Sequence, residues 1–148
     1  MRAKCPAFEI DPLALAAGHP IIAQALDWAG PRLGEAPLLV SASAPPEHVR
    51  AVQDRLGRER AGRLIEEALG EIARGLVDMG VRKLVVAGGE TAGAVVSRLG
   101  IKALRIGPQI DPGVPWTVSL GEPAIALALK SGNFGRPDFF LRAFTCLD

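Results

Sequence analysis

The sequence predicts an α/β fold, a three-layer α/β/α domain with a mostly parallel sheet. Short apolar runs typical of buried strands alternate with amphipathic segments typical of helices, and a proline-containing stretch separates the last two predicted strands. Hydrophobic residues make up 49% of the 148 residues but aromatic residues only 5%. A core built mainly from Ala, Leu, Ile and Val suits helices packed on a buried sheet, and the length fits a single domain.

The first half of the chain begins with a short strand and a helix start. Asp11-Pro12 is a typical entry into a helix, because Asp is a good N-cap and Pro fits the first turn. The longest helical pattern has apolar residues that recur once per turn, which indicates an amphipathic helix. The predicted elements are a strand at Ala7–Ile10, helices at Leu13–Ala17 and Ile21–Ala29, a strand at Pro37–Val40, a helix from Pro45 to Gly57 and a helix at Arg58–Met79.

In the second half, strands and helices continue to alternate until prolines interrupt the pattern. The prolines between Pro108 and Gly121 predict a stiff loop, since Pro cannot donate a backbone hydrogen bond to a sheet. The other predicted elements are strands at Lys83–Ala87, Ala103–Ile106 and Ile125–Leu129, a helix at Ala92–Leu99, a polar turn at Ser131–Pro137 and a terminal helix at Asp138–Phe144.

Charge and composition exclude several classes of partner. The net charge is +1 and the arginines of Arg50–Arg63 alternate with acidic residues, so no nucleic-acid partner is expected. Neither a signal peptide nor a membrane span is predicted from the apolar runs. The two cysteines lie near opposite ends, no cluster has metal-ligand spacing, and a cytoplasmic location is expected.

The first candidate site joins a buried strand to a helix. Ligands of open parallel sheets bind beyond the carboxyl ends of the strands. Gly88 and Gly89 allow a sharp turn there, and the helix that follows directs free amides at a bound anion. Thr91 could donate to a phosphate or cap the helix, and Glu90 could hold a metal-bound water, contact a ribose hydroxyl or pair with an arginine. A plain strand-to-helix turn capped by Thr91 is the alternative.

The second candidate site follows the last predicted strand. Ser131 and Asn133 can form hydrogen bonds, Gly132 and Gly135 permit close approach of a ligand, and Lys130 could screen phosphate charge. A tight turn into the terminal helix is the alternative. A third segment, Ser41-Ala42-Ser43, follows an earlier strand, and there a helix-entry loop is the favoured interpretation.

Three segments carry a resemblance to a known family. They are Val85–Val95 with its Gly-Gly-Glu-Thr run, Leu104–Trp116, and Leu129–Gly135 with Asp138-Phe139-Phe140. In this order they resemble the four-carbon acid sugar kinases, some of which are labelled Hrp-dependent type III effectors.

The resemblance implies a two-domain kinase. Its N-terminal domain would bind a threonate, erythronate or oxo-tetronate, and its C-terminal domain would bind ATP with Mg²⁺ and transfer the γ-phosphoryl group to the terminal hydroxyl. Gly88, Gly89, Glu90 and Thr91 would line the nucleotide site, and Gly132 would line it from the last loop, with Ser131 and Gly135 beside it.

Members of that family are much longer than this chain. We therefore expect residues 1–148 to form a single nucleotide-binding domain that lacks the sugar-acid domain, and also lacks a serine-containing loop that precedes the segment resembling Pro6–Asp11. Such a chain should have negligible kinase activity and weakened ATP binding, because phosphoryl transfer needs both reactants in line.

Two other function classes remain open from the sequence. One is a non-catalytic interaction or assembly module, in which an exposed apolar face would favour a homo-oligomer. The other is a dinucleotide-binding oxidoreductase domain, which the absence of a GxGxxG spacing disfavours.

Overall fold

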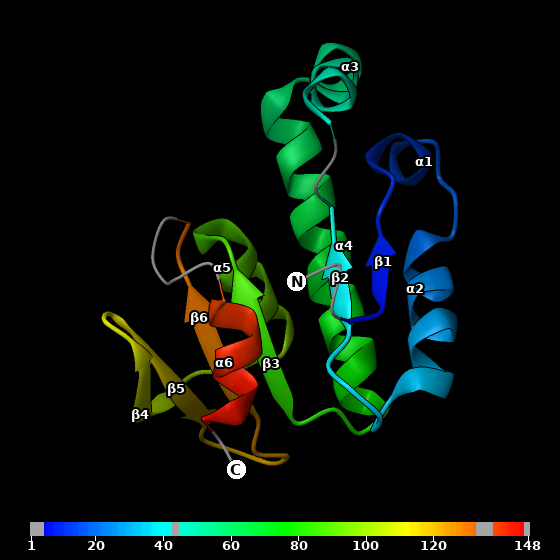
Figure 1. Cartoon of the computed structure of the whole chain (residues 1–148). Helices are drawn as coiled ribbons and strands as arrows, with labels where there is room; N and C mark the ends of the chain where they lie inside the picture. The colour runs from blue at the N-terminus through cyan, green and yellow to red at the C-terminus, as the bar shows by residue number, and fades with distance from the viewer. Residues whose placement is uncertain (1–4, 43–44, 133–137, 147–148) are drawn as a thin grey trace.

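The strands form two sheets that share one long helix. The computed structural model describes residues 5–42, 45–132 and 138–146. A small parallel sheet pairs β1 (Ala7–Glu9) with β2 (Leu39–Ser41). The larger sheet has the strand order β3-β6-β5-β4, formed by Lys83–Ala87, Ala126–Lys130, Val114–Ser119 and Leu104–Asp111 (Figure 1). The β3–β6 pair is parallel and the β4–β5 and β5–β6 pairs are antiparallel, so the α/β class is confirmed with a mixed larger sheet.

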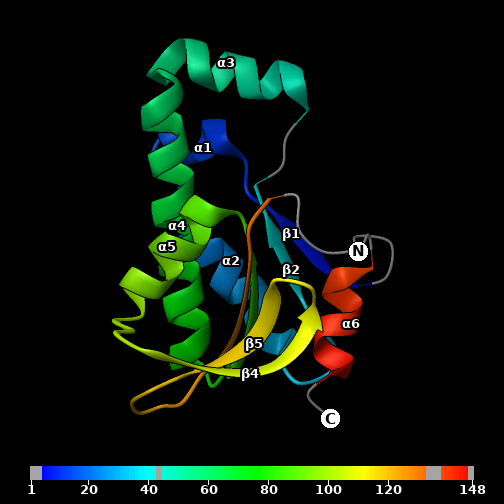
Figure 2. The ribbon, with the colours of Figure 1, turned by 90° about the vertical axis from the view of Figure 1, so that its left-hand side faces the viewer.

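Helices connect the strands as predicted from β1 to β4, whereas β4, β5 and β6 follow one another with no helix between them. Asp11 caps the first helix, because its Oδ1 accepts hydrogen bonds from the amides of Leu13 at 2.9 Å and Ala14 at 3.3 Å. The helix that follows β2 lies across the end of the longest one and away from the sheets (Figure 2). The helices are α1 (Pro12–Ala16), α2 (Ile21–Ala29) with a short 3-10 turn at Gly30–Arg32, α3 (Pro46–Leu56), α4 (Arg58–Asp78), α5 (Gly89–Arg98) and α6 (Phe139–Thr145).

Alternate residues of β3 face opposite helical layers. Val86 packs into one core with α4 and α5, whereas its neighbour Val85 packs against the core that contains α6. The same alternation separates Leu127 from Ala128 on β6. Figure 2 shows the result, with α6 on one side of the larger sheet and α4 and α5 on the other. The three-layer arrangement predicted from the sequence is therefore observed.

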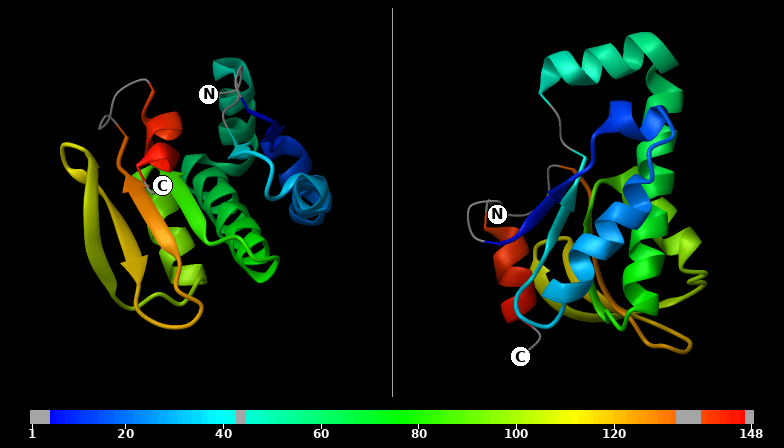
Figure 3. Two further views of the ribbon diagram at one scale, coloured as in Figure 1. Left: turned by 60° about the horizontal axis from the view of Figure 1, so that its bottom comes forward. Right: turned by 90° about the vertical axis from the view of Figure 1, so that its right-hand side faces the viewer.

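Helix α4 packs against both sheets. Ile72 lies in the core formed with β1, β2 and α2, while the next residue, Ala73, lies in the core formed with β3, β6 and α5. Figure 3 shows α2 and α4 beside the β1–β2 pair. The two faces of one long helix thus fix the two sheets relative to each other.

The prediction of a loop from Pro108 to Gly121 is wrong, because this segment forms the β4–β5 hairpin. β4 is an edge strand, and an edge strand tolerates a residue that cannot donate a hydrogen bond. The pairing register shifts between Ile106 and Gln109, which accommodates Pro108 in a bulge. Pro115 lies outside the stretch of β5 that pairs with β6, which starts at Trp116.

The hairpin holds α6 in place. Trp116 is fully buried and its Nε1 donates a hydrogen bond to the carbonyl of Ala143 at 2.8 Å. Asp111, at the end of β4, is only 4% exposed and accepts a hydrogen bond from Nη1 of Arg142 at 2.8 Å. That hydrogen bond and the charge of Asp111 raise the pKa of Arg142. Since α6 follows the second glycine-rich segment, these contacts fix the helix into which that segment leads.

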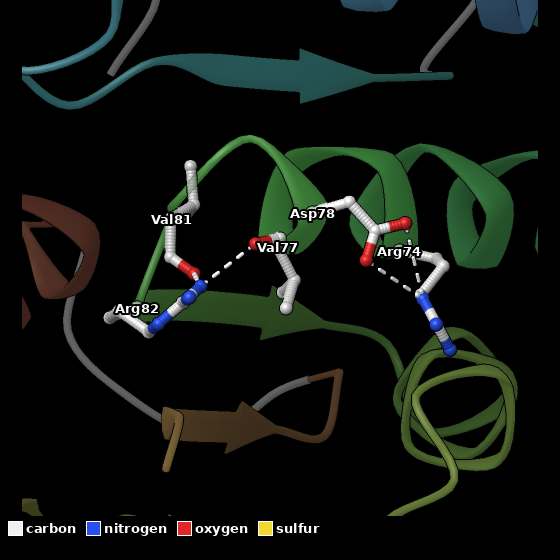
Figure 4. A network of polar contacts seen from close by, with 5 residues as sticks. All are labelled: Arg74, Val77, Asp78, Val81 and Arg82. Carbon is white, nitrogen blue, oxygen red and sulfur yellow. Dashed lines mark hydrogen bonds and ion pairs between the residues drawn. The ribbon is translucent and has the colours of Figure 1, made fainter. Parts of the chain in front are cut away.

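A single arginine closes the C-terminal end of α4. Nη1 of Arg82 donates to the carbonyls of Val77 and Val81, each at 2.8 Å (Figure 4). The last carbonyls of a helix have no partner inside the helix, and a cation there also interacts favourably with the helix dipole. Arg74 lies nearby but forms an exposed ion pair with Asp78 at 3.1 Å.

The substitution Arg82→Ala should lower the free energy of unfolding by about 1 kcal/mol, because two carbonyls lose a charged donor. Arg74→Ala is the matched control, since it removes the same charge from an exposed pair worth at most about 0.5 kcal/mol. Urea denaturation of both variants measures the difference, and equal losses would contradict a capping role for Arg82.

Candidate functional site

The structure brings the two glycine-rich segments together at one edge of the larger sheet. β3 and β6 are parallel neighbours, and their last residues, Ala87 and Lys130, are paired. The amide of Gly88 donates to the carbonyl of Lys130 at 2.8 Å, which continues the ladder into the turn. Of the residues predicted for the site, Gly88, Gly89, Glu90 and Thr91 thus lie beside Ser131 and Gly132, while Gly135 and Asn133 lie outside the described residues.

The turn after β3 is shorter than the sequence predicted. The helix was expected to begin at Ala92, but α5 begins at Gly89, so Gly88 alone separates strand from helix. Gly88 has φ +103°, a left-handed conformation that favours glycine. The amide of Ala92 donates to the carbonyl of Gly88 at 2.8 Å. The amides of Gly89, Glu90 and Thr91 precede that bond and have no carbonyl partner within the helix.

Thr91 is not the N-cap of α5, which corrects the alternative interpretation of this turn. The cap position is Gly88, and no side chain makes a capping hydrogen bond there. The Thr91 side chain leans back over the turn, since its Oγ1 lies 3.3 Å from the point where a Cβ on Gly88 would be. A hydroxyl at this place can donate to a ligand bound in front of the amides.

No described atom crowds the side-chain position of either glycine next to the turn. A Cβ built on Gly89 or on Gly132 meets no described atom within 4 Å. Both glycines are exposed. Three amides that have no carbonyl partner within the helix, at the positive end of its dipole, form a site that can accept an anion such as a phosphate group.

Lys130 and Glu90 carry the charges next to the turn. Nζ of Lys130 donates to the carbonyl of Gly132 at 2.7 Å, so the ammonium group lies over its own loop. The carboxyl group of Glu90 lies close to that of Glu66 on α4. Burial raises the pKa of Glu66, and the charge of Glu90 raises it further. The proximity of Glu66 to Glu90 could not be predicted, because it depends on the packing of α4 on α5.

The third predicted segment lies on the other sheet. Ser41 is the last residue of β2, and its carbonyl accepts a hydrogen bond from the amide of Ile10 at 2.8 Å. It therefore does not follow the strand pair that carries the glycine-rich segments. Ser43 is outside the described residues.

A hollow of about 380 Å³ lies elsewhere, lined by residues that include Arg82, Ser119 and Glu122. Arg82 precedes β3 and Glu122 precedes β6, so this hollow is at the amino ends of the parallel strands. It contains none of the residues predicted for the site. Among the described residues, no helix is long and apolar enough to cross a membrane, and no group of three or more His, Cys, Asp or Glu side chains could hold a metal ion.

Comparison with known proteins assigns the chain to a family. The family model described as "nucleotide-binding C-terminal domain" matches residues 1–140. The chain belongs to this family. The matched residues include strands β3 and β6 and the two glycine-rich segments that follow them.

Named relatives confirm the resemblance to the four-carbon acid sugar kinases. The chain is 60% identical over 143 residues to a 3-oxo-tetronate kinase of Pseudomonas fluorescens, covering 97% of this chain and 33% of the relative. It is 56% identical over 147 residues to a 3-oxo-tetronate kinase of Burkholderia multivorans, covering 99% of this chain and 34% of the relative. The chain therefore spans about a third of the length of these relatives.

Solved structures show the same fold. A crystal structure of the Haemophilus influenzae protein HI1011 matches with a TM-score of 0.89 and 39% identity, covering 97% of this chain and 35% of that one. A Bordetella bronchiseptica protein, described as a domain-swapped dimer with bound citrate, matches with a TM-score of 0.64 and 21% identity, covering 96% of this chain and 34% of that one. The second likeness concerns the fold alone.

Alanine substitutions at Gly88 and Gly89 should have different effects on the free energy of unfolding, because only Gly88 has a backbone conformation that requires glycine. Gly88→Ala should lower the free energy of unfolding by about 1–3 kcal/mol, because alanine at φ +103° is strained and its Cβ crowds Thr91. Gly89→Ala should cause no loss, because its Cβ meets nothing and alanine favours a helix. Urea denaturation compares the two, and a stable Gly88→Ala variant would show that the turn has another conformation.

Proposed function

We propose that this chain binds ATP and ADP as the nucleotide-binding domain of a kinase that phosphorylates a four-carbon sugar acid at its terminal hydroxyl. The observation that carries the proposal is the open first turn of α5, with the amides of Gly89, Glu90 and Thr91 beside the Gly132 loop. Membership of the nucleotide-binding family and the names of the kinase relatives support it.

The phosphates of the nucleotide are the groups that this turn suits. Backbone amides and the positive end of the helix dipole favour negative charge, and the Thr91 hydroxyl and the Lys130 ammonium lie next to them. The absence of a side chain at Gly89 and Gly132 lets phosphate oxygens approach the backbone closely. Glu90 would contribute its amide to this cradle.

Mg²⁺ fits this site as a companion of the nucleotide. Mg²⁺ usually keeps several waters and is held largely by phosphate oxygens, without a dedicated protein cage. The described residues contain no cluster that would form such a cage, so the amides and Lys130 would hold the phosphates and the phosphates would hold the ion. When bound, the ion would neutralise the charge that develops on the transferred phosphoryl group.

The sugar acid would bind on a different part of the enzyme. Because the chain spans about a third of its kinase relatives, we infer that residues 1–148 act as one nucleotide-binding domain and that the acceptor hydroxyl is positioned by sequence beyond it. Transfer needs that hydroxyl in line with the γ-phosphate. The nucleotide domain would therefore supply one of the two reactants.

Nucleotide binding is tested by calorimetry with ADP and Mg²⁺. The chain should bind ADP, and Gly89→Ala should weaken binding at least about tenfold, since a methyl group would fill the space in front of the amides. Gly93→Ala is the matched control, because Gly93 is also in α5 and a Cβ there also meets nothing within 4 Å. That variant should bind like the original chain.

Failure to bind ADP would contradict the proposal and favour an assembly module. Stabilisation of the chain by NAD but not by ADP would favour a dinucleotide-binding domain instead. Equal affinities of the Gly89→Ala and Gly93→Ala variants would place the nucleotide elsewhere.

The chain on its own should show negligible kinase activity toward threonate, erythronate or 3-oxo-tetronate. Positioning of the two reactants can supply about 7–11 kcal/mol of the reduction in the barrier, and this contribution needs both binding sites. A coupled assay that detects ADP release, run with each sugar acid, measures this activity. Robust turnover would show that the described domain also binds the acceptor.

A further inference from the structure

Helices α4 and α5 pack side by side and run in the same direction, since β3 returns along the sheet between them (Figure 1). Gly70 of α4 lies against α5, because a Cβ there would be 3.3 Å from Cβ of Arg98 and 3.4 Å from the carbonyl oxygen of Ala94. The next residue of α4, Glu71, forms an ion pair with Arg98. Gly70 is therefore level with the stretch of α5 between Ala94 and Arg98.

The same packing brings Arg63 level with the first turn of α5. Arg63 lies about two turns before Gly70 on the same face of α4, which is about 10.5 Å along the helix axis. Gly89, where α5 begins, lies about 7.5 Å before Ala94 and about 13.5 Å before Arg98. Arg63 thus lies beside the turn whose amides are the proposed phosphate site.

The charges of neighbouring side chains agree with this position. Burial and the charge of Glu90 raise the pKa of Glu66, whereas the charge of Arg63 opposes the rise. Glu90 belongs to the first turn of α5. A cation that acts on a carboxyl group next to Glu90 is therefore close to that turn.

The surface around Arg63 is hollowed and carries more positive than negative charge. A hollow of about 560 Å³ at the junction of α3 and α4 is lined by Leu56–Arg60 and Arg63. Three of these residues are arginines and one is a glutamate. This balance of charge favours an anionic group in the hollow.

The contact that Arg63 makes within the chain is weak and can be exchanged. Nη2 of Arg63 donates a hydrogen bond to Oε1 of Glu59, one turn earlier on α4, at 2.5 Å. The two side chains are 68% and 83% exposed, so water screens the pair and its contribution to stability is small. A phosphate group can accept two parallel hydrogen bonds from the planar guanidinium group and is a stronger partner.

Resting on the proposed function, we propose that Arg63 of α4 binds a phosphate group of the nucleotide held at the first turn of α5. In this complex the guanidinium group leaves Glu59 and donates to phosphate oxygens. The amides of α5 and the side chain of Arg63 then hold the phosphates from two different helices, and the register between these helices sets the distance between the two sets of donors.

Calorimetry with ADP and Mg²⁺ tests the role of Arg63. Arg63→Ala should weaken ADP binding at least about tenfold, because charge-assisted hydrogen bonds to the phosphate are lost. Arg63→Lys should lose less, since it keeps the charge but not the planar donor group. Arg74→Ala is the matched control, because Arg74 forms the same kind of exposed ion pair, with Asp78, near the opposite end of α4. That variant should bind ADP like the original chain.

A second arginine separates direct contact from the general effect of charge. Arg60 is exposed and lines the same hollow, but it lies off the face of α4 that packs on α5. Arg60→Ala should weaken ADP binding by less than about threefold, since it removes a screened charge and no hydrogen bond to the nucleotide. Equal losses from Arg60→Ala and Arg63→Ala would overturn the proposal, because only the net charge of the hollow would then matter.

The remaining outcomes distinguish this inference from the proposed function. If Arg63→Ala binds ADP like Arg74→Ala, Arg63 does not contact the nucleotide and the proposed function still stands. If the original chain binds no ADP, the proposed function fails and this inference fails with it. The two variants should have equal urea midpoints, because both lose an exposed ion pair. A lower midpoint for Arg63→Ala would assign Arg63 a structural role and overturn the proposal.

Discussion

The parallel pairing of β3 with β6 is the constraint on which the candidate site depends. Because the two strands run in the same direction, both glycine-rich segments leave the sheet at the same edge. The bond from the Gly88 amide to the Lys130 carbonyl carries the pairing one step into the turn and fixes the distance between the segments. An antiparallel pair would place the two segments at opposite ends of the sheet, where they could not form one binding site.

Helix α4 packs closely against both α5 and α2 and so sets the positions of these helices. It uses glycines on two sides, with Gly70 against α5 and Gly75 against Leu26 of α2, so that both neighbouring helices approach closely. The approach of α5 sets where its first turn lies, and the proximity of Glu66 to Glu90 depends on the same packing. A bound nucleotide would thus be positioned by the α4–α5 helix pair and the β3–β6 strand pair, while α3 lies across the end of α4 and away from the sheets (Figure 2).

The sequence predicted those parts of the fold that local chemistry decides. Helix α2 has the predicted bounds, Asp11 caps α1, and the two glycine-rich segments follow strands of the larger sheet. The β4–β5 hairpin was missed because prolines argue against strands unless the strand is known to lie at an edge. The early start of α5 was missed because two glycines disfavour a helix locally. The proximity of Glu66 to Glu90 was missed because the two residues are distant in sequence. The nucleotide-site roles of Gly88–Thr91, Ser131, Gly132 and Gly135 stay predictions.

The most direct measurement of the central claim is a titration of the ¹⁵N-labelled chain with ADP and Mg²⁺, followed by the amide resonances in heteronuclear NMR spectra. A chain of 15.5 kDa is suited to this method. If the first turn of α5 and the loop after β6 form one phosphate site, the largest shifts should occur at the amides of Gly89, Glu90, Thr91 and Gly132. Shifts concentrated at the opposite end of the sheet, around Arg82, Ser119 and Glu122, or no shifts at all, would contradict the account.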